Sequence, residues 1–65
     1  MTVRLFCVEF QTPEGDPDKE WFRSLYDADR FFAECEGPRR LLVIRTTHVG
    51  TRYEHDTVTI LRQAR

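Results

Sequence analysis

The sequence contains little of what most functional motifs require. Of its 65 residues only three are glycine, and no G-x-G-x-x-G or Walker-type phosphate-binding pattern is present. The two cysteines, Cys7 and Cys35, are far apart and form no CxxC pair, which excludes the usual zinc and redox motifs. We therefore expect two free, buried thiols in a reducing compartment.

Long apolar runs are also missing. No stretch has the length of a transmembrane helix, and Met1–Gln11 alternates polar and apolar residues where a signal peptide would have an apolar core. These absences predict a soluble, cytoplasmic protein that forms one domain over residues 1–65 and does not contact a membrane. A chain this short buries only about 60% of its unfolded surface, so it often depends on a partner subunit for stability.

Charge is unevenly distributed along the chain. Acids outnumber bases by five between residues 14 and 36, whereas bases outnumber acids by four from residue 37 to residue 65. Such asymmetry can steer a partner or orient self-association, although a solvated surface without a binding role is an equally good explanation.

Four segments have the alternating, β-branched and aromatic composition of strands. They are Thr2–Thr12, Lys19–Tyr26, Arg39–Val49 and Thr57–Gln63. A turn cluster, PEGDPD, separates the first two segments, which therefore form a hairpin.

Helical spacing appears between the second and third strands. Ala28, Phe31, Phe32 and Cys35 recur at i, i+3, i+4 and i+7 and form one apolar stripe on a helix over residues 28–36. Gly37-Pro38 ends this helix.

The start of the helix has two interpretations. We favour Asp27 as the N-cap, because the aromatic residues before it suit a strand. The rival is the S-x-x-D capping pattern beginning at Ser24, which would start the helix at Leu25 and place Tyr26 inside it.

These elements predict a small α+β domain of the ββαββ type. Its four-stranded, mainly antiparallel sheet has the order 2-1-3-4, with the two most apolar strands in the centre and one helix packed on one face. We expect the helix side to contain Phe6, Val8, Leu42 and Ile44, and the uncovered side to contain Leu5, Cys7, Leu41, Val43 and Leu61. An uncovered apolar face usually marks an interface, so we expect a homodimer or a dedicated protein partner.

No metal or cofactor site is predicted. The soft and borderline ligands are Cys7, Cys35, His48 and His55. None has metal-ligand spacing to another, and the segment from Asp16 to Glu20 resembles a calcium loop but has Trp21 where the loop needs glycine.

Catalysis is also not predicted. A Cys–His–Asp set can be written from Cys35, His55 and Asp56, but a thiol on the buried stripe is poorly placed to form a thiolate. The chain offers little room for a substrate cavity, and we predict a protein that is not an enzyme.

Two surfaces are candidates for binding. For a protein partner, the predicted contact residues are Asp27, Asp29, Arg30, Glu34, Glu36, Leu41 and Val43. For nucleic acid, the less favoured alternative, they are Arg39, Arg40, Arg45, Arg52 and Tyr53. A negative net charge and a pI near 6.1 argue against the second surface.

The succession WFRSLYD, DADRFFAEC and RRLLVIR over Trp21–Arg45 resembles the architecture of small proteins encoded by bacteriophages and mobile elements. Such proteins often bind and modulate one host protein, anti-CRISPR inhibitors included. The resemblance implies a regulator or inhibitor of a larger bacterial or phage machine. It covers about a third of the chain and transfers no functional residue.

Overall fold

The predicted fold class is confirmed by a computed structural model of residues 1–65. The elements follow the order β1 (Thr2–Gln11), β2 (Pro17–Phe22), α1 (Leu25–Glu34), β3 (Arg39–Thr47) and β4 (His55–Ala64). The sheet has the strand order β2-β1-β3-β4, and every neighbouring pair is antiparallel. The two most apolar strands, β1 and β3, therefore lie at the centre, as the sequence predicts.

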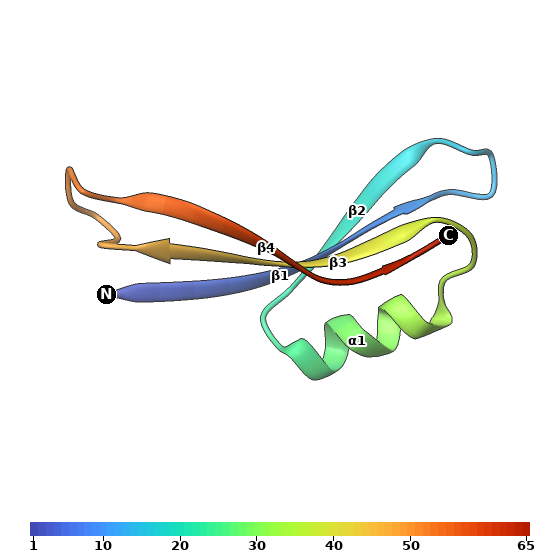
Figure 1. Cartoon of the computed structure of the whole chain (residues 1–65), viewed down its shortest axis with the longest axis horizontal. Coiled ribbons are helices and arrows are strands. Elements are labelled where there is room, and N and C mark those ends of the chain that lie inside the picture. The colour runs from blue at the N-terminus through green and yellow to red at the C-terminus, as the bar shows by residue number, and fades with distance from the viewer.

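The helix covers only one half of the sheet (Figure 1). The molecule is elongated, with extents of 40 × 22 × 14 Å, and the strongly twisted strands cross near its middle. We call the half that carries β2 and α1 the covered half. The other half is a three-stranded arm, made by residues 2–5 of β1, residues 44–47 of β3 and residues 55–58 of β4, together with the hairpin of residues 48–54 that joins β3 to β4. The chain begins at the arm and ends near the C-terminal end of the helix.

The core lies entirely in the covered half. Its fully buried members are Val8, Ala28, Phe32 and Leu41, and four further phenylalanines pack around them. Two guanidinium groups lie over the Phe32 ring, with Arg39 at 4.7 Å and Arg62 at 4.6 Å from the ring centroid. Six of 65 residues are buried in total, so the domain has little core to spare.

The helix begins at Leu25, so the favoured N-cap, Asp27, is wrong and the rival capping pattern is correct. Ser24 is extended, and its hydroxyl accepts a hydrogen bond from the Asp27 amide at 3.4 Å. Tyr26 therefore lies inside the helix. An N-cap side chain must place an oxygen three residues before a free helix amide, and the Ser24 hydroxyl does this for the Asp27 amide. The helix therefore starts about one turn before the position at which Asp27 would cap it.

The helix ends at Glu34, earlier than predicted, and Cys35 is its extended C-cap. Gly37 adopts a positive φ of 80°, which reverses the chain toward β3. The Arg39 side chain then reaches back, and its Nε donates to the Phe32 carbonyl at 2.7 Å while its Nη1 donates to the Gly37 carbonyl at 2.8 Å. One guanidinium thus satisfies carbonyls that the end of the helix leaves free.

The predicted face assignment of β3 is wrong. Val8 is opposite Leu41 and Phe6 is opposite Val43, so Leu41 and Val43 lie on the helix side. Leu41 is 1% exposed in the core and is therefore excluded from any partner interface. Leu42 and Ile44 occupy the other side, opposite Cys7 and Leu5. Because β3 is apolar at both parities, the pattern within the strand does not determine which side faces the helix.

The other boundaries differ by a few residues. β2 is shorter than predicted and stops at Phe22, because Ser24 is used as the helix cap. β4 is longer than predicted and begins at His55. A register shift in β4, opposite Leu41 and Leu42, places both Leu61 and Arg62 toward the helix side. None of the helices has the length and apolar character needed to cross a bilayer.

Candidate protein-interaction surfaces

The side of the sheet opposite the helix, here called the open face, is apolar and uncovered. Its register rows place Leu5 beside Ile44, Ile44 beside Val58, and Cys7 between Trp21 and Leu42, with Ile60 beyond. Cys7 and Leu42 are buried by their neighbours, whereas Trp21, Val58 and Ile60 are between 50% and 59% exposed. A monomeric protein rarely exposes such a continuous apolar surface without using it.

Most charged residues on the open face have partners within the chain, whereas Lys19, opposite Glu9 on β2, forms no ion pair. Arg40 forms an ion pair with Glu9, with its Nε 2.9 Å from the carboxylate oxygen. At the arm end, the Thr46 hydroxyl donates to the Asp56 carboxylate at 2.5 Å. The apolar centre is thus framed largely by polar groups that have partners within the chain.

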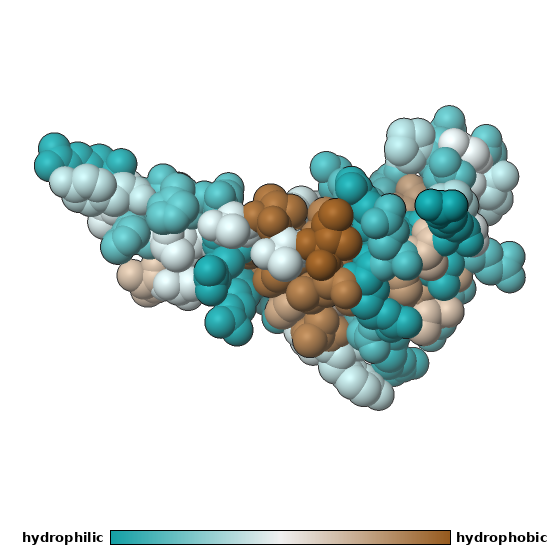
Figure 2. Space-filling model, in the orientation of Figure 1, coloured by the Kyte–Doolittle hydropathy of each residue, from teal (hydrophilic) through white to brown (hydrophobic).

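A second surface lies on the helix side, where the covered half meets the arm. It is a groove of about 310 Å³, which we call the arginine groove, lined by Arg4, Phe6, Leu25, Val43, Arg45, Thr59 and Leu61. Apolar side chains gather midway along the molecule, over the strand crossing and the start of α1 (Figure 2). Leu25 and Leu61 are more than 40% exposed, so the apolar part of the groove is open to solvent.

Two arginines at this groove have no partner in the chain. Arg4 and Arg45 are directly opposite each other on the central strands β1 and β3. The ion pairs of the molecule are Arg30–Glu34, Arg40–Glu9 and Arg62–Asp29, and no side-chain hydrogen bond involves Arg4 or Arg45. Like charges directly opposite each other in a sheet destabilise it.

The predicted acidic helix surface is partly neutralised. Asp29 pairs with Arg62 of β4, and Arg30 pairs with Glu34 one turn along the helix at 3.8 Å. Asp27 remains free in the first turn, where the positive end of the helix dipole favours a carboxylate. The structure therefore brings most of the predicted acids to one helix but leaves this surface with little net charge.

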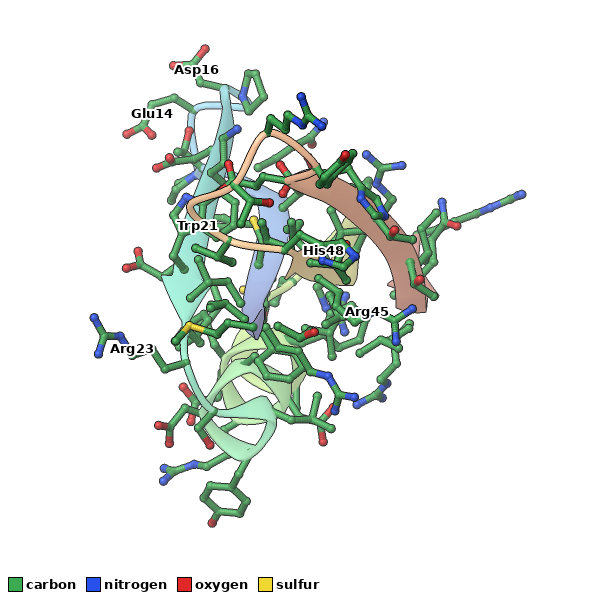
Figure 3. All side chains as sticks on the ribbon, turned by 90° about the vertical axis from the view of Figure 1, so that its left-hand side faces the viewer. Glu14, Asp16, Trp21, Arg23, Arg45 and His48 are labelled. Carbon is green, nitrogen blue, oxygen red and sulfur yellow. The ribbon has the colours of Figure 1, made fainter.

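The five residues predicted for nucleic acid are dispersed. Arg39 caps the helix, and Arg40 is paired on the open face. Arg52 and Tyr53 are at the tip of the hairpin between β3 and β4, where the Arg52 guanidinium lies 4.9 Å from the Tyr53 ring. In Figure 3, Arg45 lies well apart from the acidic corner formed by Glu14 and Asp16.

The thiols remain free, and only Cys7 is fully buried. Burial raises the pKa of the Cys7 thiol, and the nearby Glu9 carboxylate raises it further. Burial also raises the pKa of Cys35, partly opposed by Arg39. The structure contains no group of three or more His, Cys, Asp or Glu side chains placed to hold a metal.

Arg4 is one of the site residues that the sequence did not reveal, as are Leu25 in the groove and Trp21 and Ile60 on the open face. Alone, Arg4 is an ordinary polar residue in an alternating strand, and its importance comes from standing opposite Arg45. The signal that could have revealed it is the strand register, which requires the tertiary pairing. The chain matches no protein-family model, no curated protein and no solved structure.

Proposed function

We propose that this protein is a non-enzymatic interaction domain that dimerises through the open face and binds a larger protein as a regulator or inhibitor. The observation that carries the proposal is the open face itself, apolar at its centre and uncovered. The small core also supports the proposal, because a domain with only six buried residues gains stability by burying this face.

A second copy of the chain is the occupant that best fits the open face. In a two-fold dimer the same patch meets itself, so any strong charge on it would face a like charge. The Glu9–Arg40 ion pair cancels two charges near this patch, and the other two charged residues, Lys19 and Asp56, lie toward its opposite ends. The apolar centre therefore carries no charge, which makes the face compatible with its own copy.

The open face is the side of the sheet that α1 leaves uncovered. A dimer formed there would leave the helix side free for a different protein.

Sedimentation equilibrium over a concentration series tests the dimer. Ile60→Glu places a carboxylate in the centre of the open face and should yield a monomer. Thr59→Glu, one residue away on the other side of the same strand, is the matched control and should remain dimeric. Trp21, the only tryptophan, provides a second measurement, since its emission should shift to shorter wavelength as the dimer forms.

A wild-type chain that is monomeric at every concentration, with unchanged Trp21 emission, contradicts the dimer. A dimer that persists in Ile60→Glu as strongly as in Thr59→Glu contradicts the assignment of its interface.

Nucleic-acid binding is the second candidate function. It is supported by Arg45, Arg52 and Tyr53, which all lie on the arm and form no ion pair with an acid. Fluorescence anisotropy with labelled single- and double-stranded oligonucleotides tests it, because phosphate binding weakens steeply with salt. Binding that Arg45→Glu and Arg52→Glu abolish would favour this candidate over the first.

A further inference from the structure

We infer that the arginine groove binds an acidic segment of a protein partner, in which carboxylates flank a bulky apolar side chain. This inference rests on the proposed role in protein binding and identifies the chemistry of the bound segment. It concerns the helix side of the sheet and not the open face.

Positive charge at one end of the groove has no acid to balance it within the chain. The Cβ atoms of directly opposite residues are about 4.5–5.5 Å apart, so Arg4 and Arg45 concentrate two positive charges in a small volume. Every other arginine on the strands is held by an acid, a carbonyl or an aromatic ring. A bound carboxylate would relieve the repulsion and accept charge-assisted hydrogen bonds from both guanidiniums.

An apolar lining continues from the charged end of the groove. Phe6 and Val43 form the floor, and Leu25 and Leu61 form the walls from α1 and β4. The volume of about 310 Å³ suits one large side chain with its backbone, and it lies at the small end of ligand sites. A ligand that carried charge alone would leave this lining exposed to water.

The kind of side chain that lines the groove favours a protein segment over nucleic acid as its ligand. A site for single-stranded nucleic acid normally offers aromatic rings on which bases stack. The apolar residues that line this groove are aliphatic apart from Phe6, which is partly buried against the core. The exposed aromatic residue of the arm, Tyr53, is at the hairpin tip and does not line the groove. An aliphatic wall beside two arginines fits an acidic and apolar peptide.

The test is selection of random phage-displayed peptides on the immobilised wild-type protein, followed by NMR titration with the most enriched sequence as a capped synthetic peptide. We expect enriched sequences to carry Asp or Glu beside a large apolar residue. The amide shifts should change most at Phe6, Val43 and Leu61. Affinity should fall at least about tenfold in Arg4→Gln and in Arg45→Gln, and should fall with added salt.

Arg52→Gln is the matched control, because it removes an arm arginine outside the groove and should leave affinity unchanged. The inference is overturned if no peptide is enriched, if the enriched peptides lack acids, or if Arg4→Gln and Arg45→Gln bind within twofold of wild type. It is also overturned if a labelled oligothymidylate shows the arginine dependence and the peptides do not.

The Ile60→Glu variant separates this inference from the dimer. If the selected peptide binds Ile60→Glu and wild type equally, the groove acts independently of the open face. If the peptide shifts map to the open face and are lost in Ile60→Glu, the groove is not the binding site. The proposed dimer is tested separately, by sedimentation and by Trp21 emission.

Discussion

The covered half and the arm use the same strands but differ in what lies against them. In the covered half, β1 and β3 have the helix on one side, and Val8 and Leu41 are almost completely buried. A few residues away along the same strands, the arm has both sides in solvent, and residues 50–58 of the hairpin and β4 are all exposed. Strand pairing and exposed side-chain hydrogen bonds such as Thr46–Asp56 hold the arm, whereas apolar burial stabilises the covered half.

This contrast indicates where stability and binding reside. Residues that stabilise the fold concentrate under α1, where substitution should be costly. The open face spans both halves and the arginine groove lies at their junction, so both can change with smaller effects on folding. The following substitutions test this division, from the largest expected effect to the smallest.

Phe32→Ala should have the largest effect. Phe32 is 2% exposed and joins the helix to the sheet, so its truncation should lower the free energy of unfolding by about 3–5 kcal/mol. Urea denaturation followed by circular dichroism measures this loss. Thr57→Ala, on the arm and outside the open face, should change stability by less than about 0.5 kcal/mol. Similar losses at the two positions would mean that the arm is as tightly packed as the covered half.

Arg39→Ala should follow, with a loss of about 1–3 kcal/mol. The substitution leaves the Phe32 and Gly37 carbonyls without their donor and removes one of the two guanidinium groups that lie over the Phe32 ring. Thermal unfolding of Arg40→Ala provides the comparison, because that neighbour forms only an exposed ion pair, whose loss costs about 0–1 kcal/mol. A larger effect at Arg40 would contradict the capping role of Arg39.

Ser24→Ala should destabilise the helix start by about 1 kcal/mol, the usual cost of losing an N-cap. Ser24→Asp should retain most of the stability, since a carboxylate also accepts from the Asp27 amide. The midpoint of urea unfolding reports both changes. If Asp27→Ala costs more than Ser24→Ala, the helix starts later than this geometry shows.

Arg45→Thr should have the smallest effect and the opposite sign. Removal of one of two like charges directly opposite each other should raise the free energy of unfolding by about 0.2–1 kcal/mol. Arg65→Thr at the C-terminus controls for the change in net charge. A stabilised Arg45→Thr that no longer binds the selected peptide would show that the arginine pair is retained for binding at a cost in stability. A destabilised variant would indicate that the Arg45 stem packs on the groove.

Much of the fold could be predicted because its signals are local. Alternating residues predicted the four strands, the spacing of Ala28, Phe31 and Phe32 predicted the helix, and edge protection predicted the strand order. The helix start was misplaced because two capping residues, Ser24 and Asp27, are both available within one turn. Local pattern offers both, and the packing of the helix on the sheet selects one.

The candidate sites were less predictable, since they depend on pairs of residues distant in sequence. The acids of α1 were predicted as a free surface, but Arg62 lies 33 residues from Asp29 and neutralises it. Arg39 was assigned to nucleic acid because its contacts with Phe32 and Gly37 appear only when the chain turns back at Gly37.

The sequence by itself determined which residues share a face within β1, β2 and β3, because side chains alternate with a period of two. In β4 the register shift breaks this alternation at Leu61 and Arg62. It also determined that both central strands are apolar on both faces, and hence that one short helix leaves an apolar face uncovered. Only the tertiary structure decided that Leu41, and not Leu42, meets Val8. The same register sets Arg45 opposite Arg4, and it thereby creates both the buried core and the arginine groove. The sequence could not determine this register, because it depends on how two strands pair and not on either strand alone.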